Sequence, residues 1–400
     1  MNQWIVIVDS PFLPARGGGE REHYGLIKAA ADADCLALVI MPAESSCDLR
    51  GYHDLLGDTP LLITPLRRSP LRLAQRCPYG VASRPVPHDL AQSVRHLAPH
   101  ASGVIVSSWK SWRLGARLAH DLDLPAVLRM HNREGDYHRA LALGSTNPMR
   151  WVWRREARKV ACEERALAFA PWLSGIADIS LSDAQWRGSF ASVPVDHVAP
   201  FAVAHTASTV RSPSPESTVT FMGALDVATN IDALTWFTRA VWPSVLSAVP
   251  QAHFVVVGRR PTSSVYSLMR ATPSSVLHAD VPDVAPYLEA THVSVNPAIS
   301  GSGVNIKLVD SMAAGVPIVS TSRATSGLNV RPGVDLLVED DPSHFAQAVT
   351  TLLRDSRFAA QIGAQGQQRL RSMADPVRGI EQLATLLTTR VDSPSPAGGR

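Results

Sequence analysis

The residues best suited to bind a charged ligand follow a short apolar run at 292–296. A loop with Gly301 and Gly303 leads into an expected helix that carries Lys307 and Asp310. Glycine lets the backbone approach a ligand closely, and the N–H groups and positive dipole end of a helix favour an anion. We therefore predict a diphosphate site with Lys307 as its charged group. Asp310, one turn further on, is placed to accept hydrogen bonds from the hydroxyls of a ribose.

The end of this helix is marked by Gly315, a C′ residue, and by Pro317, which cannot continue a helix. The helix is expected to start near Val304. Its spacing places a mainly polar set on one ligand-facing side: Lys307, Asp310, Ser311 and Ala314. The alternative is a solvated i,i+3 pair between Lys307 and Asp310, worth only a few tenths of a kcal/mol.

Several short motifs accompany this segment: Phe221-Met-Gly-Ala-Leu-Asp followed by Asn230, Val257-Gly258, Val281-Pro-Asp283, and Ala314-Gly-Val-Pro-Ile-Val-Ser-Thr321 followed by Gly327-Leu328. Together they resemble the donor domain of retaining glycosyltransferases of family 4, which have the GT-B fold, from Thr218 to about Leu370. The resemblance implies that Gly223 approaches the donor diphosphate together with Asn230, and that the backbone of Val281 meets the nucleotide base.

This chain departs from the Glu-x7-Glu pattern that is common in that family. Asp310 stands in place of the second glutamate, and Ser302 in place of the first, which contacts the donor sugar in the family. Contact with the sugar then falls to Ser302 or to backbone groups. A literal Glu156-x7-Glu164 lies on an expected helix of the first half, and we interpret it as coincidence.

A second glycine-rich loop follows the apolar run at 4–8 and contains Gly17 and Gly18. It lacks the G-x-G-x-x-G spacing, and Glu20 and Glu22 would repel a pyrophosphate unless they point away. A flexible loop without function is the alternative. The resemblance implies that the backbone of Gly17 and Gly18 faces the donor.

His131-Asn-Arg-Glu134 ends the apolar run at 126–130 and resembles the family's His-Asn-x-Glu segment. The resemblance implies that His131 contacts the transferred sugar and is catalytic, although an isolated histidine after a strand is often structural. Glu134 is expected either to position the acceptor or to cap the following helix. The residues alone do not separate these two roles.

Alternating apolar runs and helical stretches predict an α/β protein. The runs expected as strands are residues 4–8, 35–41, 103–106, 126–130, 176–181, 219–222, 253–257, 276–278, 292–296, 317–320 and 335–338. The fold class expected is GT-B, with two Rossmann-like doubly wound domains facing each other across a cleft. We predict an acceptor-binding domain at 1–204, a linker at 205–217, a donor-binding domain at 218–375, a helix packing back toward the first domain at 376–389, and a disordered tail at 390–400.

The composition limits the partners of the chain. Its 400 residues are 45% hydrophobic and carry a net charge of +3, which is too small for a nucleic-acid-binding protein of this size. The four cysteines show no metal-site spacing and are read as free thiols of a reducing compartment. No run approaches the ~20 apolar residues of a membrane span, so a soluble, cytoplasmic protein is expected.

Neither a metal nor a cofactor is predicted. Two Asp-x-Asp sequences, at 32–34 and 121–123, precede strands and so lie at the wrong end of a sheet for a metal-bound nucleotide. Basic and aromatic residues alternate at 149–159 on an expected helix, which is typical of peripheral contact with anionic lipid at the inner face of a membrane. A solvated helix face is the alternative, and no oligomeric state is predicted.

The function that these features favour is transfer of a hexose-type sugar from a nucleotide diphosphate sugar, the co-substrate, to an acceptor hydroxyl. Retention follows from the resemblance, whereas independence of metal follows from the position of the two Asp-x-Asp sequences. Bacterial polysaccharide biosynthesis is one setting for the reaction. UDP, GDP and dTDP are the candidate carriers. Glycan, lipid-linked and natural-product acceptors all stay open. Two alternatives remain: a nucleotide-sugar epimerase or hydrolase on the same fold, and a degenerate protein that only binds nucleotide-sugar or scaffolds partners.

Overall fold

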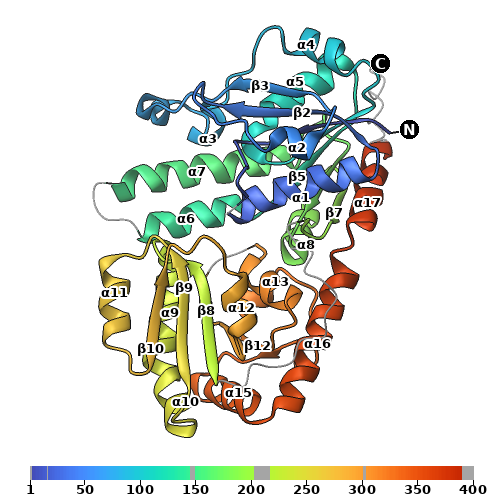
Figure 1. Cartoon of the computed structure of the whole chain (residues 1–400). Coiled ribbons are helices and arrows are strands. Elements are labelled where there is room, and N and C mark those ends of the chain that lie inside the picture. The colour runs from blue at the N-terminus through green and yellow to red at the C-terminus, as the bar shows by residue number, and fades with distance from the viewer. Residues whose placement is uncertain (1, 16, 145–148, 202–216, 301–302, 390–400) are drawn as a thin grey trace, which may run out of the picture. The chain divides into compact units, whose positions relative to one another are not determined.

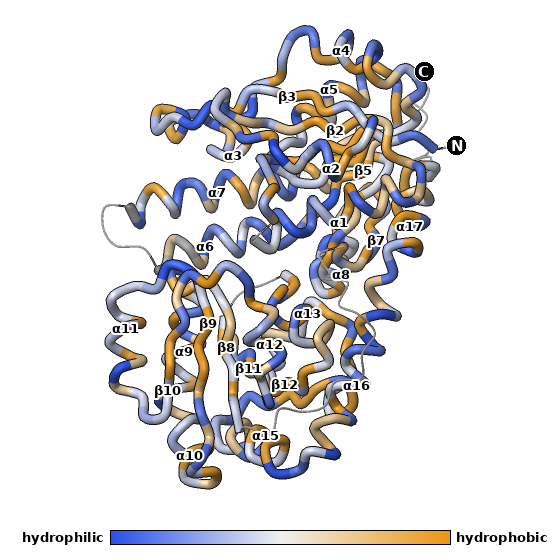
Figure 2. The backbone as a smooth tube through the Cα atoms, in the orientation of Figure 1, coloured by the Kyte–Doolittle hydropathy of each residue, from blue (hydrophilic) through white to orange (hydrophobic). Residues whose placement is uncertain are grey.

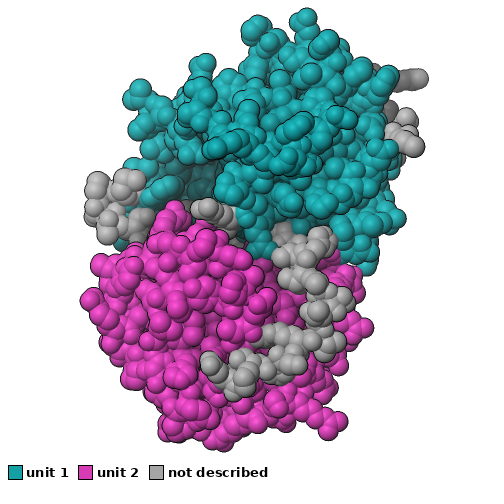
Figure 3. Space-filling model, viewed as in Figure 1, with its two compact units in different colours: residues 1–202, 375–400 teal, residues 203–374 magenta. Residues whose placement is uncertain are grey.

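The computed structural model describes residues 2–15, 17–144, 149–201, 217–300 and 303–389. The chain divides into unit 1, residues 1–202 and 375–400, and unit 2, residues 203–374, which Figure 3 colours separately. The predicted linker, apart from Ser217, and the predicted tail lie outside the described residues. Each unit is an α/β domain built on one parallel sheet (Figure 1).

Unit 1 holds a seven-stranded parallel sheet in the order β3-β2-β1-β4-β5-β6-β7. Its strands are β1 (Trp4–Ile7), β2 (Leu36–Ala43), β3 (Leu61–Pro65), β4 (Gly103–Val106), β5 (Ala126–Met130), β6 (Gly175–Asp178) and β7 (Val195–His197). Its helices are α1 (Gly18–Asp32), α2 (Tyr52–Leu56), α3 (Tyr79–Ala82), α4 (Leu90–Leu97), α5 (Trp112–Leu122), α6 (Glu134–Gly144), α7 (Met149–Leu167), α8 (Leu181–Gly188) and α17 (Pro376–Thr388), with short 3-10 helices η1 (Pro70–Ala74) and η2 (Trp109–Ser111).

Successive residues of β1 belong to two different cores, because side chains alternate across a sheet. Ile5 and Ile7 pack with residues of α4, α5 and α7, whereas Trp4 and Val6 pack with residues of α1, α2 and α17. The sheet is therefore covered on both faces, as expected of parallel strands joined by helices. Figure 2 shows its central strands near the hydrophobic end of the scale.

Unit 2 holds a six-stranded parallel sheet in the order β10-β9-β8-β11-β12-β13. Its strands are β8 (Thr218–Ala224), β9 (His253–Arg259), β10 (Ser275–Ala279), β11 (Val293–Asn296), β12 (Ile318–Ser320) and β13 (Leu337–Val338). Its helices are α9 (Ala228–Trp236), the π-helical turn η3 (Phe237–Val241), α10 (Trp242–Ala248), α11 (Ser263–Arg270), α12 (Ala285–Ala290), α13 (Ile306–Ala313), α14 (Ser322–Thr325), α15 (Pro342–Arg354) and α16 (Ser356–Met373).

Every apolar run predicted as a strand overlaps a strand of the structure, but β3 and β7 were missed. Both are edge strands of unit 1, and most of their side chains keep contact with solvent. A strand with one neighbour buries less apolar surface, so its sequence carries a weaker signal. The sheet order places the carboxyl ends of β1, β4 and β5 together in unit 1, and those of β8, β9 and β11 together in unit 2.

Candidate functional site

Lys307, Asn230 and Gly223 meet at the carboxyl end of β8. The Lys307 Nζ atom donates a hydrogen bond to Asn230 Oδ1 at 2.6 Å, and Asn230 Nδ2 donates to the Ala224 carbonyl at 2.9 Å. A Cβ atom added to Gly223 would lie 3.2 Å from Asn230 Nδ2 and 3.5 Å from Lys307 Nζ. The absence of a side chain at Gly223 therefore leaves space for the side chains of Asn230 and Lys307.

The ammonium group of Lys307 has no counter-ion among the residues that the structure describes. Its Nζ lies 4.9 Å from the ring centroid of Phe221, and no nearby charged group among the described residues offsets the effect of its burial. Burial lowers the pKa of Lys307 to about 8. A charge held in this way raises the free energy of the empty site, and an anionic ligand would lower it.

The loop before α13 is held close to a second glycine. Gly303 has φ +81, in the left-handed region that favours glycine, and an added Cβ on Gly327 would lie 2.5 Å from the Gly303 carbonyl oxygen. The N-cap residue of α13, Asn305, makes no side-chain capping bond, so no side chain occupies the first N–H groups of the helix from that position. Gly301 and Ser302, both predicted to bind the donor, lie outside the described residues.

The predicted helix is correct in type and in its end, since Gly315 follows the C-cap with φ +66. It starts at Ile306, two residues later than expected. The prediction that Ser311 faces the ligand is wrong, because this residue is fully buried. Its hydroxyl bonds to Ser294 Oγ of β11 at 2.8 Å and donates to the Lys307 carbonyl at 3.0 Å, which ties α13 to the sheet. Asp310 is half-buried one turn after Lys307.

Two more features lie at the carboxyl ends of strands in unit 2. Val281 follows β10 and packs, half-buried, against an apolar cluster that includes Met222 and Val257. Asp226, which would repel a diphosphate, instead pairs with Arg260 at 3.0 Å between Oδ2 and Nε. The structure shows an exposed arginine that neutralises a nearby carboxylate.

In unit 1, the glycine-rich loop becomes the first turn of α1. Gly17 is the N-cap residue, and its N–H donates to Glu20 Oε2 at 2.6 Å, so Glu20 folds back over the helix end. Glu22 points the other way and is buried against Arg129, with 2.6 Å between Oε1 and Nε. Of the two carboxylates, only Glu20 competes with a phosphate for the N–H of Gly17. Contact of Gly17 and Gly18 with a donor stays a prediction.

His131 directly follows β5 and presents a buried ring nitrogen. Its Nε2 has no hydrogen-bond partner within the described part of the chain. Burial lowers the pKa of His131 well below its usual range, and the nearby charges of His23 and Arg129 lower it further. The ring is therefore neutral near pH 7, with one nitrogen left for a hydrogen bond to a ligand.

Glu134 is the first residue of α6, but it does not cap this helix. Glu164 of α7 takes that role, since its two carboxylate oxygens accept from the N–H groups of Glu134 at 3.2 Å and Gly135 at 3.0 Å. Burial raises the pKa of Glu134 to about 7, against the opposing effect of Lys110. The Glu134 carboxyl group accepts a long hydrogen bond from Asn132 Nδ2 at 3.5 Å, and its contact with an acceptor stays a prediction.

A buried ionic network beside these residues was missed by sequence reasoning. Asp9, at the end of the first strand, binds Lys110 Nζ at 2.9 Å, His23 Nε2 at 3.1 Å and Ser108 Oγ at 3.1 Å. Burial alone would raise the pKa of Asp9, but Lys110, His23 and Arg84 hold it well below its usual range. One signal was available: lysine occurs only four times, and Lys110, like Lys307, follows a strand of a central sheet.

The remaining charged motifs of unit 1 have structural partners. Glu156 accepts from the Tyr79 N–H at 2.8 Å and pairs with Lys159. The first glutamate of the literal Glu-x7-Glu therefore binds groups of its own unit. The Asp-x-Asp sequences lie where α1 and α5 end, before β2 and β5. Within the described residues, no group of three or more His, Cys, Asp or Glu side chains is arranged to hold a metal ion.

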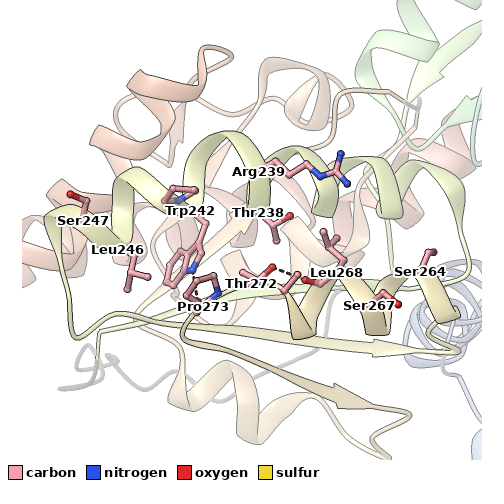
Figure 4. Close-up of a pocket in the computed structure, with 12 residues that line it drawn as sticks. Thr238, Arg239, Trp242, Leu246, Ser247, Ser264, Ser267, Leu268, Thr272 and Pro273 are labelled. Carbon is pink, nitrogen blue, oxygen red and sulfur yellow. Dashed lines mark hydrogen bonds between the residues drawn. The ribbon is translucent and has the colours of Figure 1, made fainter.

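A separate pocket of about 850 Å³ opens in unit 2 beside η3, α10 and α11 (Figure 4). Trp242 and Arg239 line one side, and Leu268, Thr272 and Pro273 line the other. Trp242 Nε1 donates to the Pro273 carbonyl at 2.8 Å across its floor. None of the residues predicted to bind donor or acceptor lines this pocket.

The chain resembles known proteins in both sequence and fold. Residues 216–355 match the family described as Glycosyl transferases group 1. The matched residues all lie within unit 2. An uncharacterized 44.6 kDa protein from a cps region of Klebsiella pneumoniae is 23% identical over 138 residues, which span 33% of this chain and 36% of that protein. The match spans about a third of the length of that protein.

Solved structures resemble the whole chain at low identity. HepE of Anabaena, in complex with UDP and glucose, has a TM-score of 0.65 at 14% identity and covers 97% of this chain and 100% of its own. Sucrose-phosphate synthase of Thermosynechococcus elongatus has a TM-score of 0.67 at 15% identity, covering 96% and 98%. S. aureus TarM, in a complex that contains UDP, has 0.69 at 10% identity, covering 96% and 100%. These likenesses confirm the predicted fold class, two Rossmann-like domains of the GT-B type.

Proposed function

We propose that this chain transfers a hexose-type sugar from a nucleoside diphosphate sugar to an acceptor hydroxyl. The observation that carries the proposal is the environment of Lys307, a half-buried ammonium group held by Asn230 and lacking a described carboxylate partner. It lies in the first turn of α13, beside the carboxyl end of β8, where N–H groups and helix dipole add to its charge. This combination suits a diphosphate better than a neutral ligand.

Transfer requires that the charge developing on the departing diphosphate be stabilised, and preorganised donors do this without reorganisation. We assign this role to Lys307 and the start of α13, and assign contact with the transferred sugar to His131 and with the acceptor to Glu134. The donor-binding residues of the proposal are Gly17, Gly18, Gly223, Asn230, Val281, Gly301, Ser302, Gly303, Lys307 and Asp310.

The finer assignments rest on the motifs quoted from the sequence. Membership of family 4 and retention of anomeric configuration follow from the resemblance. Independence of metal rests on the position of the two Asp-x-Asp sequences before strands, and Lys307 supplies a positive charge that a metal would otherwise provide. UDP is our first choice of carrier, because HepE and TarM were solved with UDP. GDP and dTDP remain the alternatives.

The test is turnover of nucleotide-sugar by a Lys307→Ala variant. Loss of one charge-stabilising donor typically lowers kcat by about 10²- to 10³-fold, and we expect a loss of this size with the thermal transition retained. Lys28→Ala is the matched control, since Lys28 is an exposed lysine paired with Asp32 on α1. Unchanged turnover in Lys307→Ala would contradict the assignment.

Product analysis separates the enzyme alternatives. A transferase forms glycosylated product only when an acceptor is present, whereas a hydrolase releases free sugar and an epimerase releases an altered sugar without one. The non-enzyme alternative, a degenerate binding protein, is motivated by Ser302 in place of the family's glutamate. Binding of UDP with no consumption of any donor across a broad acceptor panel would favour it.

A cytoplasmic location, peripheral at the inner face of a bacterial membrane, belongs to the same proposal. No helix in the described residues is long and apolar enough to cross a membrane. The peripheral contact rests on the basic and aromatic residues at 149–159. Glycans, lipid-linked sugars and natural products are the acceptor classes considered.

A further inference from the structure

The exposed face of α7 is uniformly basic. Trp151 keeps 68% of its surface exposed near the start of the helix, with the guanidinium carbon of Arg154 5.7 Å from its ring centroid. Four exposed arginines follow this tryptophan at spacings of three, four, seven and fourteen residues. Helical geometry places residues with these spacings along the same face: Arg154, Arg155, Arg158 and Arg165. The polar residues of this face thus share one sign of charge.

Each of the three glutamates of α7 has a partner elsewhere in unit 1, and none of them forms an ion pair with an arginine of this face among the described residues. Glu156 and Glu164 are buried and bind groups of unit 1. Glu163 accepts a hydrogen bond from Trp112 Nε1 at 2.8 Å. A merely solvated helix usually mixes both signs of charge on its outer side, so this segregation calls for an anionic partner.

A second element, η1, extends the same surface. Lys159 Nζ of α7 donates to the Leu73 carbonyl at 2.9 Å, and Arg155 Nη2 donates to the Ala74 carbonyl at 3.3 Å, so η1 lies against α7. Leu71 of η1 is 85% exposed. No acidic residue occurs between Asp58 and Asp89, whereas this stretch contains Arg67, Arg68, Arg72 and Arg76.

We propose that these two elements, defined as the α7–η1 surface by Leu71, Trp151, Arg154, Arg155 and Arg158, dock on an anionic lipid bilayer. Trp and Leu gain free energy by entering the boundary between headgroups and acyl chains, and arginines pair with anionic headgroups while their stems cover apolar surface. A hydrophilic polyanion would use the arginines but would leave Leu71 and Trp151 exposed to water. This inference deepens the proposed peripheral location, and its test does not depend on transfer activity.

The test is co-sedimentation of the full chain with phosphatidylcholine vesicles prepared with and without phosphatidylglycerol. We expect binding only when phosphatidylglycerol is present, weakening as salt increases because surface charges are screened. A double variant, Leu71→Ala with Trp151→Ala, keeps every charge and should bind about tenfold more weakly or worse. Tyr266→Ala is the matched control, because Tyr266 is an exposed aromatic residue of unit 2 and should leave binding unchanged.

Charge reversal and footprinting complete the test. Arg154→Glu with Arg158→Glu should abolish binding, whereas reversal of two exposed arginines of unit 2, Arg270 and Arg357, should not. Cys162 lies on the same exposed face of α7, so vesicles should slow its alkylation in site-resolved mass spectrometry. Heparin serves as a hydrophilic polyanion for comparison. The proposal is overturned if the protein binds both vesicle types equally, if the Leu71 and Trp151 variant binds vesicles like the parent, or if the protein binds heparin but no vesicle.

Discussion

Burial of the Lys307 ammonium group lowers the stability of the protein when no ligand is bound. Burial lowers its pKa from 10.5 to about 8, so the unfolded chain holds this proton more tightly than the folded chain does. The charged side chain therefore destabilises the fold at pH 7, and this cost fades as the pH rises from about 8 toward 10.5. An anion that pairs with Lys307 would remove the cost and raise the pKa again, which couples donor binding to the protonation of this one group.

We expect the pH profile of transfer to reflect Glu134 and Lys307 together. With pKa values of about 7 for Glu134 and about 8 for Lys307, kcat/KM should rise as Glu134 ionises and fall as Lys307 loses its proton. Steady-state rates measured across this pH range check the prediction. Glu134→Gln should remove the acidic limb and leave the alkaline limb in place. If the variant keeps both limbs, Glu134 has no part in the reaction.

At the scale of elements, α6 depends on a carboxylate from α7. Glu164 accepts from two N–H groups at the start of α6 and also binds Arg187 Nη2 at 3.0 Å. Arg187 in turn bonds through Nε to Asp178 of β6 at 2.9 Å. A single buried charge network thus joins α6, α7, α8 and β6, and it positions Glu134 through the backbone of α6.

Glu164→Gln should weaken this network, because Arg187 loses a buried partner and the helix end loses a negative charge. We expect a loss of about 3 kcal/mol in the free energy of unfolding, in the range seen for broken buried ion pairs. Urea denaturation measures it, and amide hydrogen exchange should quicken first in α6. Arg158→Ala, on the exposed face of α7, is the control and should change stability little. Equal exchange in α6 for both variants would rule out the capping role.

The loop before α13 is set by close packing between two glycines. A Cβ on Gly327 would come within 2.5 Å of the Gly303 carbonyl oxygen, so Gly327→Ala must displace that loop. We expect UDP binding by calorimetry to weaken about tenfold, because a small shift misaligns the N–H groups facing the ligand. Gly19→Ala is the control, since nothing lies within 4 Å of an added Cβ at Gly19. Unaltered UDP affinity in Gly327→Ala would mean that this loop does not hold the diphosphate.

At the scale of the whole molecule, each unit has its own cores, and the last helix belongs to unit 1. Trp4, Leu26 and Leu383 share one core of unit 1, which brings α17 against α1, β5 and β6. The cores of unit 2 draw on β8, β9, β11, α13 and α16 among others. Separate cores predict that the two units unfold in separate transitions under calorimetry.

We expect UDP to raise the transition of unit 2 selectively, because Lys307, Asn230 and Gly223 all lie in that unit. Ligand at 100 times its Kd stabilises a binding unit by about 2.7 kcal/mol. Differential scanning calorimetry with and without UDP measures the shift, and Lys307→Ala should abolish it. A shift confined to the transition of unit 1 would be inconsistent with the proposed donor site.

The sequence by itself determined the class of fold and the helix that carries Lys307. Apolar runs alternating with helices indicate parallel sheets, because parallel strands covered by helices on both faces consist mostly of apolar residues. Glycine, lysine and the stop at Gly315 and Pro317 are local signals, and they correctly predicted α13. Edge strands β3 and β7 were not predicted, since half-exposed strands do not form a continuous apolar run.

Only the tertiary structure decided which partners these residues have. Asn230 reaches Lys307 across 77 residues, and Glu164 reaches the N–H groups of Glu134 and Gly135 from a different helix. Periodicity placed Ser311 on the ligand side of α13, yet the position of β11 buries it against Ser294. Helical spacing determines which residues share a face of a helix, whereas the packing of elements distant in sequence determines which residues that face contacts.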